Sequence, residues 1–513
     1  MDWRKEAEEI ARRRAEAAAQ GGPEAVAAQH AKGRLTIRER IERLAEPGSF
    51  REFGRIAGAE EDADGVRRFT PANYVVGFAR IGGRQVVVGG EDFTLKGGSP
   101  NAAGLRKSVF SEDIAHQARL PLVRFLEGGG GSVRGSSGKG PQGAPVNQPH
   151  RFLSIARLLG EVPVVSAAVG PVAGFPAARL VASHFALMTR TAQVMIAGPK
   201  VVERAVNRTL TKEELGGPDV HAKTGVVDAV ADTEEEACAA IARFLSYLPD
   251  NVWAPLPVLP AEDPPDRQEE ALLAAVPRDR RRAYDMRRIL AHVLDRDSLF
   301  EMTRKFGPGQ ITALARLAGH PVGVLANDCR FYAGAMTAEG AQKVRRFVDL
   351  CNTFRLPIIS FVDEPGFMIG PEAEKAGTIR HGAAAIAAVV QSRVPWATVL
   401  VRKSFGVAAM AHFGPDGYVL SWPSSEAGPL PLEGGVAVAF AREIAAAPDP
   451  EAKRAELEAL FAERMSPFPA AEGFSVHDLI DPRETRPALA AWLETARARL
   501  ALLTGPHLCA MRP

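Results

Sequence analysis

The chain has 513 residues, of which 46% are hydrophobic and 24% are charged. This composition is typical of a globular protein with a large core, and no apolar run approaches the roughly 18 residues that a membrane helix needs. The formal net charge of +2 gives no broad positive field, so the charge balance argues against a nucleic-acid partner.

The first 46 residues have a helical pattern. Trp3, Ala7 and Ile10 recur at helical spacing, and Thr36-Ile-Arg-Glu39 has the form of a capping box. The segment carries charge from its first residues and shows no secretory signal, which predicts a cytoplasmic protein. We expect its Lys and Arg side chains to form a solvated face; the alternative is a grip on a phosphorylated ligand.

Two strand-like runs between residues 74 and 90 flank Gly82-Gly83, a typical signal for a two-residue hairpin. A polar stretch over 91–98 leaves the second strand. The pattern then predicts a helix over 104–118 and a buried strand that ends at Glu127. Strand, helix and strand in this order predict a right-handed crossover in a parallel sheet.

The segment 128–149 is rich in Gly, Ser and Pro and contains Arg134 and Lys139. It is either a surface loop or a lid whose two cations face phosphates. A helix over 152–159 and an apolar strand over 162–169 follow. Residues 170–177 then turn into another helix, whose first N–H groups could hold an anion, and a helix over 234–248 covers this half.

The strand-acid-glycine stretch at 120–132 occurs again at 356–367, and the repetition extends well beyond it. Five pairs of residues share a spacing of 236: Gly83 and Gly319, Asp92 and Asp328, Gly98 and Gly334, Pro121 and Pro357, and Glu127 and Asp363. Two further matches, Val162-Pro163 with Val394-Pro395 and Gly174 with Gly406, share a spacing of 232. A constant spacing predicts two tandem copies of one fold.

The second copy starts near Arg282, after a Pro-rich and acidic linker over 250–267. Its pattern predicts helices over 338–354 and 381–390 and an apolar strand over 396–401. Residues 402–412 then mirror the turn at Gly174.

Each copy therefore has two glycine turns, and such turns present fixed N–H donors. Donors of this kind stabilise an oxygen that becomes negative during a reaction, by about 3–4 kcal/mol each. A doubled set indicates two enolate-like species in one reaction.

The usual catalytic motifs do not occur: there is no G-x-S-x-G elbow, no H-E-x-x-H helix and no Walker A loop. The four cysteines form no C-x-x-C pair, so neither a zinc ribbon nor a disulfide framework is expected. Cys351 is interpreted as a core residue, and Ser132 has no evident histidine partner. His381 and His412 are interpreted as structural or substrate-orienting groups, and Glu127 and Asp363 as groups that stabilise the turns.

Several motifs resemble the carboxyltransferase (β) subunits of biotin-dependent acyl-CoA carboxylases, of the propionyl-CoA and methylcrotonyl-CoA type. The motifs that carry this resemblance are Gly33-Arg-Leu-Thr-Ile-Arg-Glu-Arg-Ile, Ile196-Ala-Gly-Pro199, Glu214-Leu-Gly-Gly217, Lys223-Thr-Gly225, Leu248-Pro-Asp-Asn251, Phe361-Val-Asp-Glu-Pro-Gly-Phe367, Ile379-Arg-His-Gly382 and Arg402-Lys403.

The resemblance implies an α/β fold with two tandem crotonase (ClpP/crotonase)-like domains, each a β-β-α superhelix with a mostly parallel sheet. The N-terminal domain, 1–255, would serve the acyl-CoA and the C-terminal domain, 256–513, the biotin. A dimer-based homohexamer is implied, with active sites between the N-terminal domain of one subunit and the C-terminal domain of its partner. The chain contains no Ala-Met-Lys-Met biotinylation site, so the biotin carboxylase and the carboxyl carrier are expected to be separate chains.

The activity implied is the transfer of CO2 from carboxybiotin to an acyl-CoA, with the biotin nitrogen as the base. Gly129 and Gly130 would donate to the thioester oxygen, and Val407 and Ala408 to the biotin oxygen. The other expected substrate-binding residues are Gly131, Gly174, Phe175, Met410, Arg134 and Lys139, the expected biotin-binding residues are Gly366, Phe367 and Gly406, and no metal is expected.

Two departures from the family pattern concern the turns. The first turn has four glycines where the family usually has Ser-Gly-Gly-Ala, and the second reads Gly406-Val-Ala-Ala-Met410 where the family usually has Gly-Gly-Ala-Tyr-Asp. Met410 replaces an acidic residue and is flexible and apolar, which predicts a larger or branched acyl group than acetyl. The alternatives are a biotin-dependent decarboxylase subunit and a non-catalytic scaffold that binds acyl-CoA.

Overall fold

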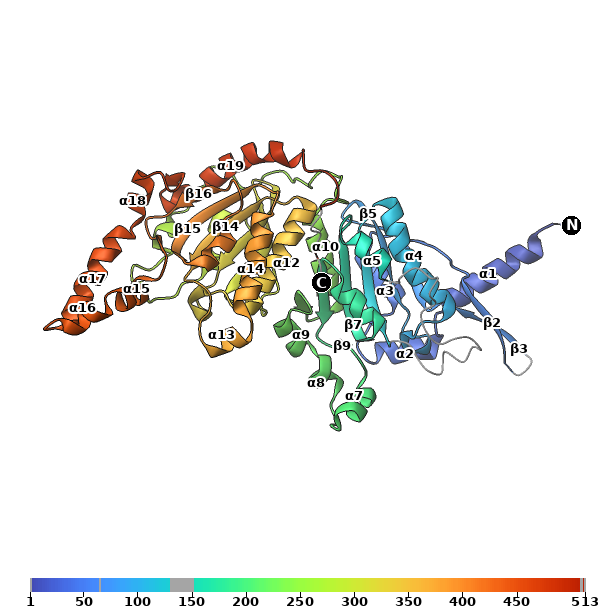
Figure 1. The fold of residues 1–513 in the computed structure, drawn as a ribbon. Coiled ribbons are helices and arrows are strands. Elements are labelled where there is room, and N and C mark those ends of the chain that lie inside the picture. The colour runs from blue at the N-terminus through green and yellow to red at the C-terminus, as the bar shows by residue number, and fades with distance from the viewer. Residues whose placement is uncertain (1, 64–65, 130–151, 508–510, 512–513) are drawn as a thin grey trace. The chain divides into compact units, whose positions relative to one another are not determined.

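The computed structural model describes residues 2–63, 66–129, 152–507 and 511. The chain folds into two compact units, Met1–Ala254 with Met511–Pro513, and Pro255–Ala510 (Figure 1). Within the described residues, each unit has a sheet of eight strands with helices packed against it. Every helix in the described ranges is too short or too polar to cross a lipid bilayer.

The first unit begins with three helices, continues into its sheet and ends with a helix that follows the last strand. Its elements are α1 (Arg4–Ala18), α2 (Pro23–His30), α3 (Ile37–Leu44), β1 (Arg51–Glu52), β2 (Gly58–Ala63), β3 (Val66–Pro71), β4 (Tyr74–Ile81), β5 (Arg84–Glu91), η1 (Lys96–Gly98), α4 (Ala102–Ala118), β6 (Leu122–Gly128), α5 (Leu153–Leu158), β7 (Val164–Ala173), α6 (Phe175–Val181), β8 (Phe185–Thr189), β9 (Gln193–Met195), α7 (Pro199–Val206), α8 (Lys212–Gly216), α9 (Pro218–Thr224), β10 (Ala229–Ala231) and α10 (Glu234–Tyr247).

The second unit follows the same plan and adds helices near its C-terminal end. Its elements are η3 (Glu270–Ala274), α11 (Met286–Val293), β11 (Phe300–Met302), β12 (Gln310–Leu317), β13 (His320–Asn327), η4 (Tyr332–Gly334), α12 (Ala338–Phe354), β14 (Ile358–Glu364), α13 (Pro371–Lys375), α14 (Thr378–Val390), β15 (Trp396–Phe405), η5 (Val407–His412), β16 (Tyr418–Ser421), β17 (Glu426–Gly428), α15 (Leu432–Ala439), α16 (Ala441–Ala446), α17 (Pro450–Arg464), α18 (Pro467–Glu472), β18 (Asp478–Leu479), η6 (Pro482–Glu484) and α19 (Thr485–Leu500).

The two sheets have the same strand order. The first runs β1-β4-β5-β6-β7-β8-β10 with β9 paired to β7, and the second runs β11-β12-β13-β14-β15-β16-β18 with β17 paired to β15. In both, the first two pairings are antiparallel and the others are parallel. The predicted α/β class and the predicted repeat are therefore confirmed.

Equivalent elements keep the spacings seen in the sequence. Helix α4 corresponds to α12 and strand β6 to β14 at the spacing of 236, while β7 corresponds to β15 at the spacing of 232. Both long helices end at an arginine in the left-handed conformation, Arg119 and Arg355. The capping box at Thr36 and the hairpin at Gly82-Gly83 also form as predicted.

Two strand ends predicted from apolar runs were wrong. Strand β7 continues past Val169 to Ala173, and β15 continues past Val401 to Phe405. The extensions form because the short strands β9 and β17 pair with them, at Pro171 and Lys403 for example. Backbone pairing thus continues where the apolar pattern has already ended.

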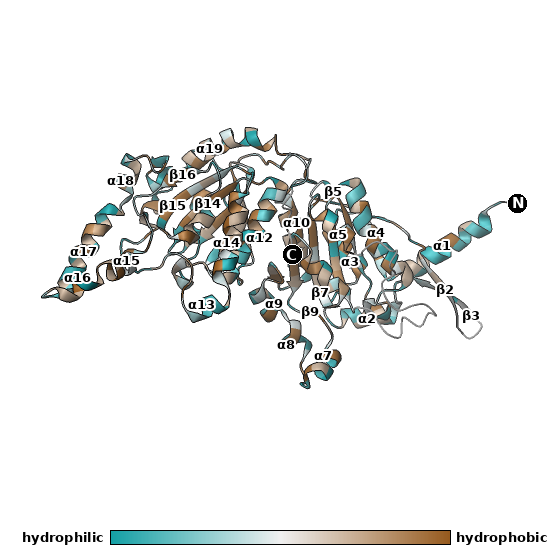
Figure 2. Cartoon of the chain, viewed as in Figure 1, coloured by the Kyte–Doolittle hydropathy of each residue, from teal (hydrophilic) through white to brown (hydrophobic). Residues whose placement is uncertain are grey.

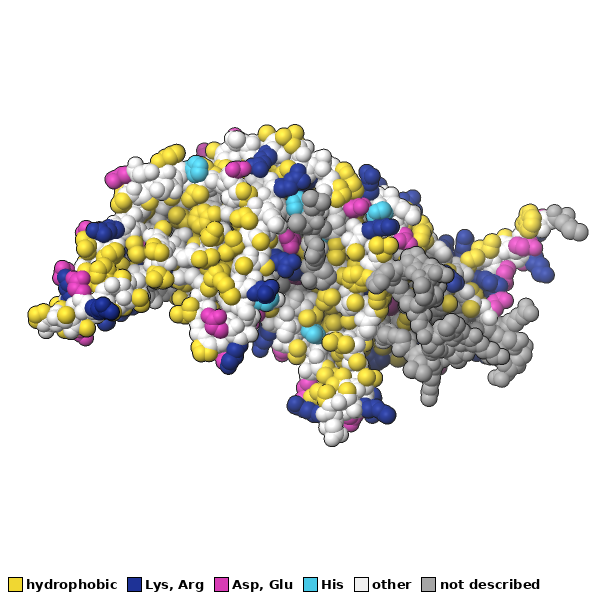
Figure 3. Space-filling view, viewed as in Figure 1, with side chains coloured by type: hydrophobic (Ala, Val, Ile, Leu, Met, Phe, Trp, Pro, Cys, Tyr) yellow, Lys and Arg dark blue, Asp and Glu magenta, His cyan; other side chains and the backbone are white. Residues whose placement is uncertain are grey.

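The cores lie against the sheets, whose strands are the most hydrophobic elements (Figure 2). In the second unit, one cluster joins α11, β12–β16 and α19 and includes the fully buried Trp422. Hydrophobic side chains also reach the surface: Ile196, Val201 and Val206 on and before α7 are 98%, 63% and 58% exposed, beside Lys and Arg side chains (Figure 3). An exposed apolar patch of this kind is typical of a contact surface.

Candidate active site

Each unit has a sharp glycine turn between a long central strand and a short helix. Gly174, between β7 and α6, has a φ of 69° and a ψ of −131°, and Gly406, between β15 and η5, has a φ of 64° and a ψ of −163°. Positive φ at these points favours glycine. The first N–H groups of a helix have no acceptor within the helix, so the turns expose the amides of Phe175 and Val407.

The second unit brings most of its predicted site residues together. Gly366 has a φ of 126°, and a Cβ atom placed on it would lie 4.0 Å from the carbonyl oxygen of Phe405, directly before the Gly406 turn. Phe367 pairs with Met336 in an isolated bridge, which holds the 366–367 segment against η4 and α12. The loop after β14 therefore lies beside the turn after β15.

Side chains at this turn differ in exposure. Val407 and Met410 are 56% and 51% exposed, whereas Ala408 is fully buried. Phe367 is half-buried, and Gly406 is exposed. The turn thus offers a backbone donor next to two exposed apolar side chains.

The first unit has the same arrangement where the structure describes it. Gly128 at the end of β6 pairs with Val172, two residues before the turn at Gly174, and the exposed Gly129 follows. Phe175 is half-buried beside the turn. Four residues of the predicted site lie outside the described residues: Gly130, Gly131, Arg134 and Lys139.

A pair of left-handed turns beside the glycine turns was not predicted. Residues 96–98 have φ values of 52°, 61° and 67°, and residues 332–334 have φ values of 53°, 56° and 93°. A Cβ atom on Gly98 would lie 2.2 Å from the carbonyl oxygen of Glu127, and one on Gly334 would lie 2.6 Å from that of Asp363. The repeated glycine at 98 and 334 was the available signal, but the polar stretch was interpreted only as a strand exit.

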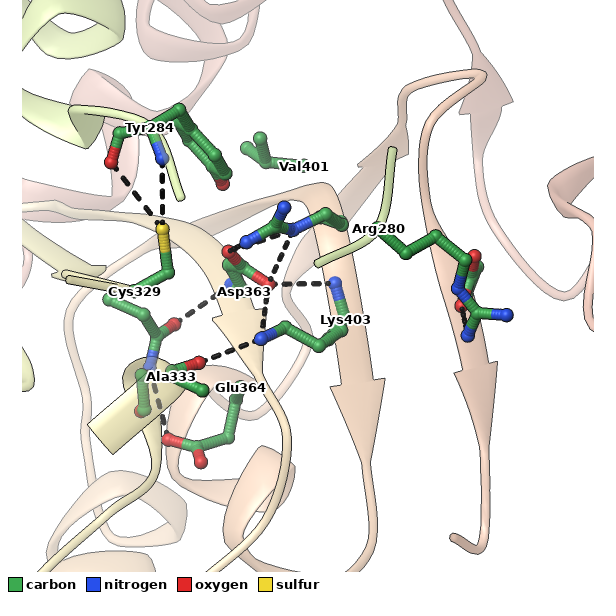
Figure 4. A network of polar contacts seen from close by, with 12 residues as sticks. Arg280, Tyr284, Cys329, Ala333, Asp363, Glu364, Val401 and Lys403 are labelled. Carbon is green, nitrogen blue, oxygen red and sulfur yellow. Dashed lines mark hydrogen bonds and ion pairs between the residues drawn. The ribbon is translucent and has the colours of Figure 1, made fainter. Parts of the chain in front are cut away.

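Asp363 at the end of β14 is the centre of a buried polar network (Figure 4). Its carboxylate is fully buried and accepts hydrogen bonds from Arg402 at 2.9 and 3.1 Å. The Lys403 Nζ atom lies 3.5 Å from the same carboxylate and donates to the carbonyl oxygen of Ala333 at 2.7 Å. Lys403 therefore joins the strand end to the left-handed turn, and the predicted turn-stabilising role of Asp363 has a physical basis.

The groups around Asp363 stay uncharged or paired. Burial raises the pKa of the Tyr284 hydroxyl well above its ordinary value, and the nearby Asp363 charge raises it further.

Two buried cysteines of the second unit are protonated thiols. Burial raises the pKa of both the Cys329 and the Cys351 thiol. A protonated thiol is a poor nucleophile, and the complete burial of Cys351 confirms that it is a core residue.

A second buried polar network, centred on His412, holds η5 in place. His412 is fully buried; its Nδ1 lies 2.9 Å from the Ser360 hydroxyl and its Nε2 lies 3.5 Å from Glu364. The Asn327 amide also donates to Glu364, at 3.0 Å. His412 thus anchors the helix that starts at the glycine turn, in keeping with the structural role predicted for it.

The equivalent acid of the first unit, Glu127, obtains its cation differently. Arg40 of α3 approaches it at 2.6 Å and also binds Glu234 at 2.7 Å. The prediction that the N-terminal cations form a solvated face was wrong for Arg40, which is only 1% exposed. The position equivalent to Arg402 is Gly170, where a Cβ atom would lie 2.3 Å from the Glu127 carboxylate oxygen.

The described residues contain no group of three or more His, Cys, Asp or Glu side chains that could hold a metal ion. What the site offers instead is a set of backbone donors on two rigid turns. Such donors can stabilise negative charge on oxygen without a titrating side chain.

Comparisons with known proteins agree with this geometry. Residues 28–503 match the family model described as "Carboxyl transferase domain". The propionyl-CoA carboxylase carboxyltransferase subunit of Haloferax mediterranei is 34% identical over 502 residues, 96% of each chain, and the methylmalonyl-CoA decarboxylase subunit alpha of Veillonella parvula is 31% identical over 481 residues, 91% of each chain. The transcarboxylase 12S hexamer, solved with methylmalonyl-coenzyme A and methylmalonic acid, superimposes with a TM-score of 0.86 at 30% identity and covers 100% of this chain and 97% of that chain.

The chain belongs to the carboxyl transferase domain family, and it is a carboxyltransferase of the kind found in acyl-CoA carboxylases. The comparisons confirm the carboxyltransferase family and the crotonase-like fold that were expected from the sequence.

The Asp363 network gives a prediction about stability. Replacing Arg402 with Met leaves a fully buried carboxylate with only Lys403 nearby, and we expect the free energy of unfolding to fall by about 3 kcal/mol. The control is Arg483→Met, whose pair with Asp481 has side chains 36% and 33% exposed, and which should lower the free energy of unfolding much less. Urea unfolding followed by circular dichroism measures both; equal losses would contradict a special role for the buried pair.

Proposed function

We propose that this chain transfers the carboxyl group of carboxybiotin, held on a separate carrier protein, to the α (or vinylogous γ) carbon of an acyl-CoA. The observation that carries the proposal is the equivalent pair of glycine turns, one in each unit, each followed by a helix whose first N–H groups have no partner within the helix. Two turns can stabilise two oxyanions, one on each substrate.

Biotin, when bound, supplies the CO2 and the basic nitrogen that removes the substrate α-proton. The chain itself binds and orients the biotin and the acyl-CoA. The amides of Val407 and Ala408 donate to the biotin oxygen, and Gly366, Phe367 and Gly406 surround it. His412 is fully buried and lies 2.9 Å from the Ser360 hydroxyl, so it is not available as a base at this turn, which fits a reaction whose base comes with the cofactor.

The acyl-CoA occupies the first unit in this proposal. Gly129 and Gly130 donate to the thioester oxygen, Gly174 and Phe175 line the CoA, and Gly131, Arg134 and Lys139 contact its remaining groups. Residues 1–255 thus form the acyl-CoA domain and 256–513 the biotin domain.

The partners proposed are a biotin carboxylase with its carboxyl carrier, and further copies of this chain in a dimer-based homohexamer in the cytoplasm. The solved 12S relative is a hexamer, and the exposed Ile196, Val201 and Val206 around α7 offer an apolar contact surface for a second copy.

A second candidate is the reverse reaction, decarboxylation of a malonyl-type CoA, which the Veillonella parvula relative favours. The decisive assay supplies the chain with carboxylated carrier or with free biotin. Carboxylation of acyl-CoA supports the proposal, and release of CO2 from a malonyl-type CoA supports the second candidate. If neither activity is observed, the chain is a binding scaffold.

The backbone donor at Val407 can be tested because proline removes an N–H group yet is tolerated at the first position of a helix. We expect Val407→Pro to lower kcat by about 10²–10³-fold, the typical cost of one lost oxyanion donor. The matched control Val407→Ala keeps the N–H and should retain kcat within a few-fold. Steady-state assays with carboxylated carrier measure both; similar kcat values for the two variants would show that this amide is not a donor.

The apolar side chain of Met410 leads to a prediction about the size of the acyl group. Because Met410 is apolar and half exposed at the turn, we expect kcat/KM for propionyl-CoA and longer esters to exceed that for acetyl-CoA by about tenfold or more. Met410→Asp should reduce this ratio, whereas Leu502→Asp, at a position 82% exposed and far from the turn in sequence, should not. A strict preference of the unmodified enzyme for acetyl-CoA would contradict the prediction.

A further inference from the structure

The second unit contains a cavity of 320 Å³ that the proposed transfer reaction does not use. It lies between the strands β15, β16 and β17 and the segment that joins α17 to α18. Leu400, Ser404, Val419, Ser421 and Ala427 form its wall on the strand side. A volume of this size falls in the range of small-molecule pockets.

The first unit has an apolar core at the positions equivalent to the strand side of this cavity. Strand registers make Leu400 and Ser421 equivalent to Ala168 and Met188, because both pairs lie opposite each other on neighbouring strands. In the same way, Ser404 and Ala427 are equivalent to Val172 and Val194. The four residues of the first unit pack in one hydrophobic cluster.

In the second unit, three of those four positions carry a shorter side chain: serine replaces valine and methionine, and alanine replaces valine, while Leu400 is longer than Ala168. The strand side of the cavity is therefore more polar than the equivalent core of the first unit, and the segment from Arg464 to Ala470 encloses the cavity from the other side. Interiors are close-packed as a rule, so a hollow of this size lined partly by hydroxyl groups is typical of a ligand site.

The lining combines apolar walls with a few polar groups. Ser404, Ser421 and Ser425 are all buried, and the hydroxyls of Ser421 and Ser425 lie 2.6 Å apart. Arg464 at the end of α17 also lines the cavity, and its side chain is exposed. The Arg464 guanidinium lies over the Phe461 ring, 5.3 Å from its centroid. No ion pair of Arg464 with a carboxylate is present among the described residues, so its charge is available to an anionic ligand.

We propose that this cavity binds an aliphatic carboxylate. Its volume has room for roughly ten non-hydrogen atoms if each takes about 30 Å³, the volume of one water molecule in the liquid. The hydrocarbon chain lies against Leu400 and Val419, and the carboxylate faces Arg464. The site is coupled to the second glycine turn, because Gly406 donates to the carbonyl oxygen of Gly428 at 3.1 Å. Gly428 directly follows the cavity-lining Ala427, and Gly406 lies two residues after the cavity-lining Ser404.

Octanoate has the required size and is the probe. Calorimetric titration into the full chain, without CoA ester or carrier, should show one saturable site per chain. Ser404→Val with Ser421→Met introduces the two side chains of the first unit, narrows the cavity by three heavy atoms and should weaken binding at least tenfold. Because the titration uses neither biotin nor acyl-CoA, its result is independent of the transfer reaction.

A second variant, at the surface, tests whether Arg464 binds the carboxylate of octanoate. Arg464→Gln should weaken octanoate at least fivefold and leave the binding of 1-octanol unchanged, while Arg454→Gln, on the same helix but outside the cavity lining, should change neither. This arm remains decisive if the double variant of Ser404 and Ser421 does not fold. Absence of saturation below about 1 mM octanoate, or equal affinity of the unmodified chain and the Arg464 variant, would overturn the proposal.

Discussion

Each unit depends on a buried carboxylate at the end of its central strand that must have a cation. Asp363 is held by Arg402 and Lys403, and Glu127 by Arg40. Leaving either acid unpaired in a fully buried position would cost several kcal/mol. Because β6 and β14 each end one residue after these acids, the ion pairs also fix where the glycine-bearing loops begin.

The two units reach the same geometry by different routes. In the second, the cation comes from the neighbouring strand, and the same strand delivers Lys403 to the left-handed turn. In the first, Gly170 leaves room for the Glu127 side chain, and the N-terminal helix α3 supplies Arg40 instead. Helix α3 is thus part of the scaffold of the first turn, which explains why Arg40 is buried and not solvated.

Much of this architecture could be predicted from the sequence because glycines and acids recur at fixed spacings. Helix α12 begins and ends at the predicted residues, and the turns at Gly174 and Gly406 form where expected. The burial of Arg40 could not be predicted, since its partners Glu127 and Glu234 are distant in the chain. The ends of β7 and β15 were missed because they depend on pairing with short strands, which leaves no apolar pattern.

The donor that we propose at residue 407 belongs to the main chain. The valine at this position is 56% exposed, so its side chain contributes little to the packing of the turn. Any amino acid except proline has the same backbone N–H group. If the proposed role is correct, the position is defined by the backbone conformation that Gly406 permits and not by the identity of its own side chain.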